Sequence, residues 1–295
     1  MSSDAVPHLS TSQPQKQQTQ RRLSLRLYLI RHGETESNVQ KIVIGQSDSP
    51  LTVKGVEQAK ALGEQLAESN RSFWRIYSSD LPRAQHTAQL IIDKHSPILP
   101  VRFKPRLREL ARGAREGLPK VLSEMEAFSE RERLGIMDPI PLFETPGEGW
   151  SRVSDWLDEV MEDAAQESGY VVPDNSDNDS KDTPNDGDKV LNVLVISHSG
   201  LLRIFLERLL GTQRLRQHPD ARFENKNGVP ALSIPNSSLT ILNIDLSPRE
   251  IEISNHLDDN DAKNHQSWVA SDAVLIEQLT STEHYSRMQA AALSH

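Results

Sequence analysis

Two apolar runs are the clearest features of the hydrophobic pattern. They span residues 25–30 and 190–196, and each is typical of a buried strand. Shorter apolar segments at 75–78 and 101–103 predict two further strands. Elsewhere apolar residues recur every three or four positions, which predicts amphipathic helices. These helices are expected over 51–69, 81–94, 119–137, 150–166 and 201–210. The alternation of strands and helices indicates one substantial α/β domain.

Both long apolar runs lead directly into a histidine. Arg31, His32 and Gly33 follow the first run, and His198 follows the second after a single serine. Open α/β folds place their ligands at the carboxyl ends of the strands. A guanidinium binds phosphate oxygens in bidentate geometry, and a neutral imidazole can attack phosphorus and hold the phosphoryl group covalently. The two strand ends therefore predict a phosphate site.

The surroundings of the two histidines favour this interpretation over an ordinary surface turn. A helical pattern begins just after His198, so free backbone N–H groups of its first turn would face an anion. Gly33 would let the backbone approach the anion closely. An Arg-His pair alone can be a simple turn, but a second histidine in a matching context raises the case for chemistry.

Six ordered segments of the chain resemble the histidine phosphatase superfamily, which includes cofactor-dependent phosphoglycerate mutases, fructose-2,6-bisphosphatases and many small-molecule phosphatases. The segments are LYLIRHGETESN, GQSDSPLTVKGVEQAKALG, IYSSDLPRAQHTAQLI, LRELARGAREG, VLVISHSGLLR and NSSLTIL. The resemblance covers residues 25–246. It implies an α/β fold of the phosphoglycerate mutase-like type, a three-layer α/β/α sandwich with a mostly parallel central sheet.

The resemblance also implies roles for four residues of a phosphate pocket. It makes His32 the nucleophile that becomes phosphohistidine, with Arg31 and Arg83 binding the transferred phosphoryl group and His198 as the second histidine of the pocket. A cage of positive charge stabilises the transition state, because negative charge spreads over the equatorial oxygens. Pro82 suits the first turn of a helix, which places Arg83 near that helix's N-terminus.

Two further residues match functional positions of the family, and for each a purely structural role is the alternative. Glu109 matches the general acid, but neighbouring arginines would lower its pKa, and it could simply pair with one of them. A bound phosphorylated substrate would neutralise part of that charge and raise the pKa again. The arginines in question are Arg106, Arg108, Arg112 and Arg115. Asn38 matches a position that lines the site with an amide donor, and its alternative is a loop residue that caps a turn.

The chain departs from the family pattern at a few positions. Glu116 fits the family's Glu-Gly pair, but Arg115 stands before it where relatives often have an aromatic residue. Mutases typically carry an aromatic residue at the position of Arg112. Residues 145–150 resemble a Pro-Gly-Gly-Glu-Ser pattern with one glycine missing. Glu148 is therefore either an acid at a helix N-terminus, which is the more favoured interpretation, or a residue that supports the site.

Composition and charge narrow the classes of partner. The net charge of −9 argues against nucleic acid or an anionic membrane as the main partner. The chain contains no cysteine, which excludes disulfides and thiolate metal ligands and favours an intracellular, cytoplasmic setting. No apolar run approaches the ~18 residues that span a bilayer. We expect no metal and no cofactor, because arginines supply the positive charge.

Three segments lie outside the expected core. Residues 1–24 are polar and predict a disordered N-terminal tail before a catalytic domain over 25–255. Residues 174–188 hold six aspartates and one lysine, and predict a disordered acidic insertion. Residues 256–295 form a C-terminal extension, in which 271–292 is either a helix packed on the domain or a mobile segment.

The leading hypothesis is a metal-independent phosphatase that hydrolyses phosphomonoesters of small metabolites through a phosphohistidine intermediate. Its partner is then a small phosphorylated metabolite, while the oligomeric state stays open. One alternative is phosphoryl transfer of the cofactor-dependent phosphoglycerate mutase type. Another is a non-catalytic phosphate-binding or scaffold protein. The charged segment 119–137 is expected to cover the site and to govern which substrate enters.

Overall fold

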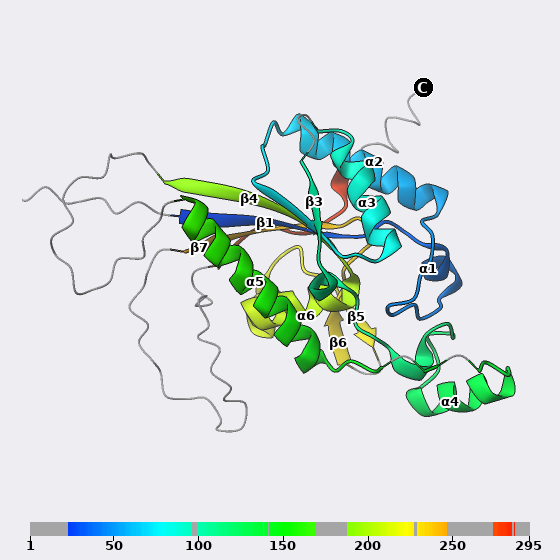
Figure 1. The fold of residues 1–295 in the computed structure, drawn as a ribbon. Coiled ribbons are helices and arrows are strands. Elements are labelled where there is room, and N and C mark those ends of the chain that lie inside the picture. Colours follow the sequence, from blue (N-terminus) through cyan, green and yellow to red (C-terminus); the bar gives the residue numbers. More distant parts are fainter. Residues whose placement is uncertain are drawn as a thin grey trace, which may run out of the picture.

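A six-stranded sheet forms the centre of the protein in the computed structural model (Figure 1). Its strands are β1 (Leu23–Arg31), β2 (Arg75–Ser78), β3 (Val101–Phe103), β4 (Lys189–Ser197), β7 (Leu239–Asp245) and β8 (Val274–Ser281). They lie in the order β3-β2-β4-β1-β7-β8. The neighbours among β3, β2, β4 and β1 are parallel, while β7 is antiparallel to β1 and to β8. The sheet is therefore mostly parallel, as expected.

The structure describes most of the chain, and every structural statement below concerns that part. The described residues are 23–95, 99–137, 139–140, 142–168, 188–226, 229–246, 274–284 and 286. The predicted tail falls outside them except for its last two residues, which already belong to β1. The predicted acidic insertion falls outside them except for Asp188.

Helices cover both faces of the sheet and complete three layers. Figure 1 shows α2 (Val53–Glu68) and α3 (Pro82–Ile92) on one face, and α5 (Pro146–Ser168) and α6 (Ser199–Leu210) on the other. The smaller elements are α1 (Glu36–Gln40), η1 (Pro105–Leu107), η2 (Gly113–Arg115), α4 (Glu124–Arg133), α7 (Thr212–Gln217), and the antiparallel pair β5 (Phe223–Lys226) and β6 (Val229–Leu232). The predicted α/β/α sandwich is confirmed.

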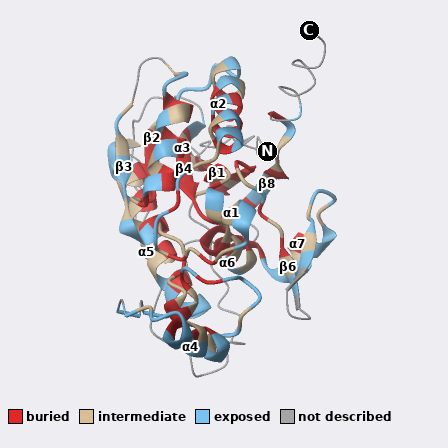
Figure 2. Ribbon diagram, turned by 90° about the vertical axis from the view of Figure 1, so that its right-hand side faces the viewer, coloured by how far each residue is buried: buried red, intermediate tan, exposed pale blue. Residues whose placement is uncertain are grey.

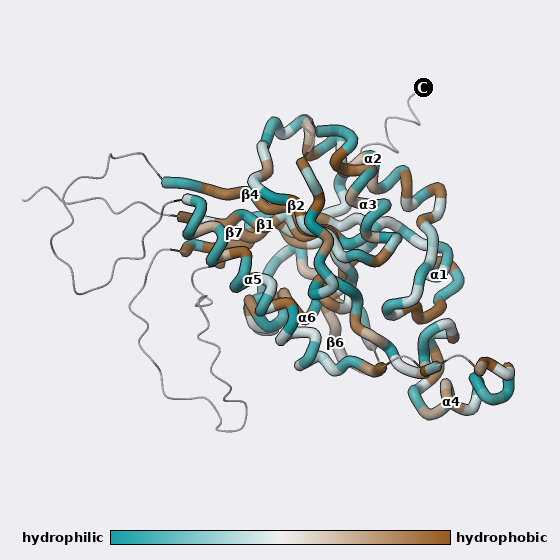
Figure 3. The backbone as a smooth tube through the Cα atoms, viewed as in Figure 1, coloured by the Kyte–Doolittle hydropathy of each residue, from teal (hydrophilic) through white to brown (hydrophobic). Residues whose placement is uncertain are grey.

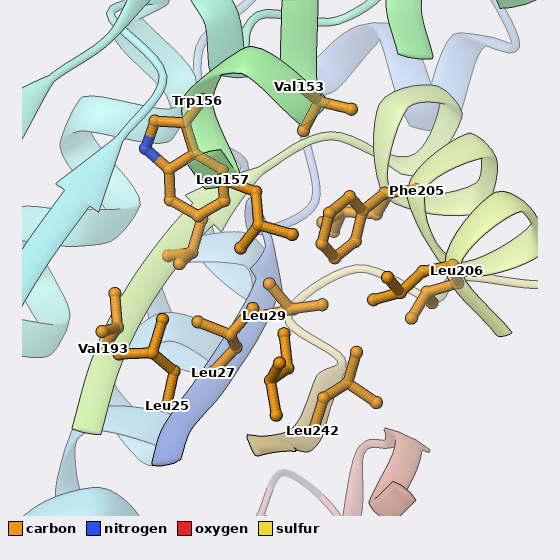
Figure 4. Packing of buried hydrophobic residues seen from close by; sticks show 14 of the residues in the cluster. Leu25, Leu27, Leu29, Val153, Trp156, Leu157, Val193, Phe205, Leu206 and Leu242 are labelled. Carbon is orange, nitrogen blue, oxygen red and sulfur yellow. The ribbon is translucent and has the colours of Figure 1, made fainter. Parts of the chain in front are cut away.

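Side chains of β1 alternate between two hydrophobic clusters, as the pleat of a strand requires. Leu27 and Leu29 point to the side of α5 and α6, where Trp156 packs in the same cluster (Figure 4). Tyr28 and Ile30 belong to the cluster beneath α2 and α3. Burial on both faces explains why β1 reads as a continuous apolar run. Figures 2 and 3 show buried, hydrophobic positions concentrated along the central strands.

Local signals begin the two helices that flank the site. The Thr52 hydroxyl accepts a hydrogen bond from the Gly55 backbone N–H and caps α2, as its sequence predicts. Pro82 occupies the first turn of α3, where its missing N–H costs nothing. This turn places Arg83, only 2% exposed, at the N-terminal end of α3.

The C-terminal part of the chain corrects one prediction. Residues 274–281 form β8 and not part of a helix over 271–292, and β8 extends the sheet beyond the predicted domain end at 255. Ile244 of β7 pairs with Val274, and Val274 and Leu279 are buried in the core. The open backbone groups of β7 and the apolar surface beside them outweigh the helix propensity of this segment.

Candidate active site

Two parallel neighbouring strands bring the two histidines together. In the β1–β4 register, Arg31 lies opposite Ser197, so the residues that follow emerge side by side. The His32 backbone N–H donates to the Ser197 carbonyl at 3.0 Å. The rings of His32 and His198 lie 5.1 Å apart between centroids, and both residues are buried. The structure thus places both predicted histidines at one sheet edge.

The hydrogen bonds of His32 define which ring nitrogen is free to react. Its Nδ1 lies 2.7 Å from the Gly33 carbonyl oxygen, which can only accept, so Nδ1 carries the proton. Nε2 of the neutral ring therefore keeps its lone pair. Burial lowers the pKa of His32 well below its ordinary value, and the nearby His198, Arg83 and Arg31 lower it further. The ring is held in the neutral, nucleophilic form.

His198 is fixed by a hydroxyl and keeps one buried nitrogen unpaired. Its Nε2 lies 2.8 Å from the Ser79 Oγ, at the end of β2. Its Nδ1 is buried and has no hydrogen-bond partner among the described residues. Burial, followed by the charges of Arg83 and Arg31, lowers the pKa of His198 well below its ordinary value. The ring can donate one hydrogen bond to an anion beside His32.

Arg31 and Arg83 are each anchored by the terminal nitrogens of the guanidinium. Arg31 donates to the Ile234 carbonyl at 2.6 Å, and Arg83 donates to the Gly45 and Ser47 carbonyls at 2.8 and 2.7 Å. The Nε of both arginines is buried and unpaired within the described part of the chain. Burial lowers the pKa of Arg31 to about 10, which leaves it charged at neutral pH.

Three buried nitrogens of the site thus lack a hydrogen-bond partner among the described residues: Nε of Arg31, Nε of Arg83 and Nδ1 of His198. Buried polar groups are normally paired, and an unpaired one calls for an explanation. The charges of Arg31 and Arg83 lower the pKa of both His32 and His198, so the four side chains lie close enough to interact electrostatically. A tetrahedral oxyanion could accept from all three nitrogens.

The side-chain carboxylate of Glu109 lies at the N-terminal end of α6. Its carboxylate accepts from the backbone N–H groups of Gly200 at 3.0 Å, Leu201 at 3.2 Å and Leu110 at 2.9 Å. The N–H groups at the start of this helix were expected to face an anionic ligand, and the anion that they bind is Glu109. A Cβ at position 200 would lie 2.3 Å from its Oε1, so glycine permits this approach.

Opposing effects set the protonation of Glu109. Burial alone would raise the pKa of this carboxyl, but the charge of Arg112 and the hydrogen bonds from Gly200 and Leu110 outweigh burial and lower it. The sequence predicts this effect of neighbouring arginines. Glu109 is accordingly a carboxylate at neutral pH, and an approaching phosphate would shift its pKa upwards by offsetting the positive charge.

Asn38 supports Arg31 through its side-chain oxygen. Its Oδ1 accepts from Arg31 Nη2 at 3.5 Å, from the Thr35 backbone N–H at 3.3 Å and from Asn236 Nδ2 at 3.0 Å. The bond from Thr35 belongs to a capping box at the start of α1. Asn38 therefore contacts Arg31 and takes part in a capping box through its side-chain oxygen, while its expected role as an amide donor to the ligand stays a prediction.

Several residues at the site were not assigned a role from the sequence. Asn236 donates to the His32 and Gly33 carbonyls at 3.1 Å, and so fixes the loop that carries His32. Gln46 donates to the Glu109 carbonyl at 3.1 Å. These contacts bridge distant parts of the chain. The motif NSSLTIL includes Asn236, but nothing in its spacing identifies the partner.

The structure describes the contacts of Glu148 and of α4 within segment 119–137, while the expectation that this segment covers the site stays a prediction. Glu148 is exposed and accepts from the Thr145 backbone N–H at 2.8 Å, which is the contact of an acid at a helix N-terminus. Segment 119–137 contains α4, which packs through Ala127 against Ala114 and Leu118. Glu148 thus stabilises α5, and α4 is attached to the loop that follows Glu109.

The described residues include neither a metal-binding cluster nor a membrane-spanning helix. No group of three or more histidine, cysteine, aspartate or glutamate side chains there is arranged to hold a metal ion. Among the described helices, none has the length and apolar character needed to cross a bilayer.

Several known proteins are similar to this chain in sequence. The sequence profile described as "Histidine phosphatase superfamily (branch 1)" matches residues 27–173. Over 187 residues, the chain is 31% identical to the adenosylcobalamin/alpha-ribazole phosphatase of Escherichia coli, covering 63% of this chain and 80% of that protein. It is 29% identical to the broad-specificity phosphatase YOR283W of Saccharomyces cerevisiae, covering 63% of this chain and 70% of the other.

Other similar proteins carry different names. A probable phosphoglycerate mutase GpmB from Serratia proteamaculans is 31% identical over 188 residues, covering 63% of this chain and 75% of that protein. Among solved structures, phosphoglycerate mutase from Bacillus anthracis has a TM-score of 0.55 at 20% identity, covering 91% of this chain and 98% of that one. That likeness supports the fold.

Proposed function

The chain belongs to the histidine phosphatase superfamily and is a phosphatase of that group, and we propose that it hydrolyses phosphomonoesters of small metabolites through a phosphohistidine at His32. The observation that carries this proposal is the trio of buried, unpaired nitrogens beside the neutral His32 ring. Three donors and two fixed positive charges suit the equatorial oxygens of a phosphoryl group in transfer.

The first step transfers the phosphoryl group to the enzyme. The lone pair of His32 Nε2 attacks phosphorus, and the bond from phosphorus to the leaving oxygen breaks. Arg31, Arg83 and His198 hold the three remaining oxygens. Glu109, protonated once the phosphate offsets the charge around it, gives its proton to the leaving oxygen. The products of this step are the free alcohol and phosphohistidine.

The second step returns His32 to its starting state. Water attacks phosphorus while the Glu109 carboxylate takes a proton from it, and the bond from phosphorus to Nε2 breaks. Inorganic phosphate leaves, and Glu109 is ready to act as an acid again. The chain needs no metal for this cycle, because its own arginines supply the positive charge. The cysteine-free composition supports action in the cytoplasm.

The test compares phosphate release from a panel of phosphorylated metabolites by the wild type and by His32→Ala. We expect a loss of roughly 10³-fold or more, because the nucleophile is removed. Acid quenching during turnover should trap phosphoenzyme in the wild type alone. His86→Ala is the matched control, since His86 is an exposed histidine on α3. Equal phosphate release by wild type and His32→Ala would rule out this mechanism.

A mutase activity is the rival outcome of the same assay. It requires transfer of the phosphoryl group between substrate molecules, so activity would depend on an added bisphosphorylated cofactor and would release no phosphate to water. Phosphate release without such a cofactor supports the phosphatase.

A further inference from the structure

Glu116 is a buried carboxylate whose acceptor sites are all in use. Its Oε1 accepts from the backbone N–H groups of Gln46 at 3.1 Å and Arg112 at 2.8 Å. Its Oε2 accepts from the Ser47 backbone N–H at 3.2 Å and the Ser47 hydroxyl at 2.8 Å. Glu116 itself is only 5% exposed. Three of these four bonds hold the turn at residues 45–47 in place.

The same turn holds Arg83 through its carbonyl groups. Gly45 and Ser47 direct their carbonyl oxygens to Nη2 and Nη1 of Arg83, while the N–H groups of Gln46 and Ser47 point to Glu116. Gly45 has a φ of 55°, and a Cβ there would lie 1.9 Å from the Glu116 Oε1. The turn therefore lies between the Glu116 carboxylate and the Arg83 guanidinium and is hydrogen-bonded to both.

We propose that Glu116 is a positioning residue for phosphoryl transfer, which fixes the turn at 45–47 and thereby aims the free Nε edge of Arg83 at the phosphate. This inference rests on the proposed function. A guanidinium bound along one edge can turn only as far as those carbonyls allow. Loss of the Glu116 contacts would release the turn, and Arg83 would lose its fixed orientation.

A carboxylate is required because every neighbouring group on Glu116 is a donor. In Glu116→Gln, one oxygen remains and an NH₂ group replaces the other, so the amide faces either two backbone N–H groups or Ser47 with the wrong polarity. The variant keeps the size of the side chain and removes its negative charge. It therefore separates a geometric role from a simple effect of charge.

The two roles predict opposite signs for binding of orthovanadate, an oxyanion that mimics the transferred phosphoryl group. If Glu116 positions Arg83, vanadate binds Glu116→Gln roughly tenfold or more weakly. If Glu116 acts only through its charge, removing that charge strengthens binding of the anion. Calorimetric titration of vanadate into wild type and variant decides the sign, and unchanged or tighter binding overturns the inference.

A matched control and a double variant guard against general damage. Glu124 is a partly buried glutamate that accepts from the Ala114 backbone N–H at 3.1 Å and makes no described contact with the turn at 45–47. Glu124→Gln should bind vanadate like the wild type. In an Arg83→Ala background, Glu116→Gln should cause little further loss, because its effect passes through Arg83. Full additivity of the two losses overturns the inference.

A second variant and the phosphoenzyme assay distinguish failure of the inference from misfolding and from failure of the proposed function. If Glu116→Gln does not fold, Glu116→Asp serves instead: it keeps the charge but withdraws the carboxylate from the turn, so weaker vanadate binding supports positioning and unchanged binding refutes it. Suppose that the wild type releases phosphate and forms phosphoenzyme, and that the variant binds vanadate as tightly as the wild type. The inference about Glu116 is then wrong, while the proposed function stands. Wild type without phosphoenzyme shows failure of the proposed function, and the inference falls with it.

Discussion

His32 and His198 lie beside the partly buried Arg31 and the buried Arg83, so burial of the rings and nearby positive charge both lower the pKa of each histidine. Each effect disfavours the protonated imidazole. His32, the proposed nucleophile, is thereby neutral without a carboxylate partner of its own. Glu109 experiences the same positive charge with the opposite sign of effect, since positive neighbours stabilise its ionised form. The same positive charge thus keeps His32 neutral and Glu109 ionised before phosphate binds, and a bound phosphate would raise the pKa of Glu109.

Arg112→Ala tests this account of Glu109. Arg112 is the main charge that lowers the pKa of Glu109, so its removal should raise that pKa. If protonated Glu109 is the acid, the pH at which kcat/KM falls on the alkaline side moves upwards. The measurement is kcat/KM against pH with one phosphorylated substrate.

The control for this pH profile is Arg115→Ala in the same loop. Arg115 donates to the Lys120 carbonyl and is not among the charges that set the pKa of Glu109. In Arg115→Ala, kcat/KM should fall on the alkaline side at the same pH as in the wild type. If the alkaline fall of kcat/KM in Arg112→Ala occurs at the wild-type pH, Glu109 is not the acid that titrates there.

The elements themselves follow from local sequence to very different degrees. β2 and β3 have the predicted bounds, and α2 and α3 begin at the predicted Thr52 cap and Pro82. Their signals are local: an apolar run, a capping hydroxyl, a proline. β8 could not be found this way, because its strand conformation depends on pairing with β7. The role of the turn at 45–47 is equally nonlocal, since Glu116 and Arg83 reach it from distant segments.

The N-terminal turn of α2 also contacts the loop after His32, and Gly55→Ala tests that contact. In an ordinary helix this change stabilises by about 1 kcal/mol. Here a Cβ on Gly55 would lie 2.1 Å from the Glu34 carbonyl oxygen. We therefore expect the free energy of unfolding to fall by about 1–3 kcal/mol, with a loss of phosphatase activity as the loop shifts.

Gly147→Ala in the first turn of α5 is the matched control, because its Cβ would meet nothing among the described atoms closer than the Thr145 hydroxyl at 3.9 Å. It should be neutral or stabilising by up to about 1 kcal/mol. Urea unfolding monitored by tryptophan fluorescence measures both variants. Equal stabilisation of the two would show that the contact between α2 and the loop imposes no constraint.

For the molecule as a whole, an acidic chain encloses a cationic site. The net charge is −9, yet Arg31, Arg83, Arg112 and Arg203 all lie near Glu109. Among the described histidines, three are buried: the pair at the site, and His284 just beyond β8. A histidine that is neutral when folded and protonated when unfolded makes global stability depend on pH.

His284 allows this dependence to be measured. Burial lowers its pKa to about 4, against about 6.5 in the unfolded chain. Between these values the unfolded state binds a proton that the folded state does not, so the free energy of unfolding falls as pH drops through this window, by about 3 kcal/mol. His32 and His198 act in the same direction.

The variant His284→Gln should flatten this pH dependence, whereas His86→Gln, at an exposed position on α3, should leave it unchanged. Urea unfolding across a pH series gives both slopes. If His284→Gln loses stability with falling pH as steeply as the wild type, His284 is not the group that titrates on unfolding.

The position of β1 in the sheet also fixes when the protein can fold. β1 is the first described strand to leave the ribosome, but its two partners, β4 and β7, begin only at Lys189 and Leu239. Its apolar run must therefore wait unpaired while most of the chain is synthesised, and pairing of such distant segments is slow. The strand that delivers His32 is thus the one most in need of protection from aggregation in the newborn chain.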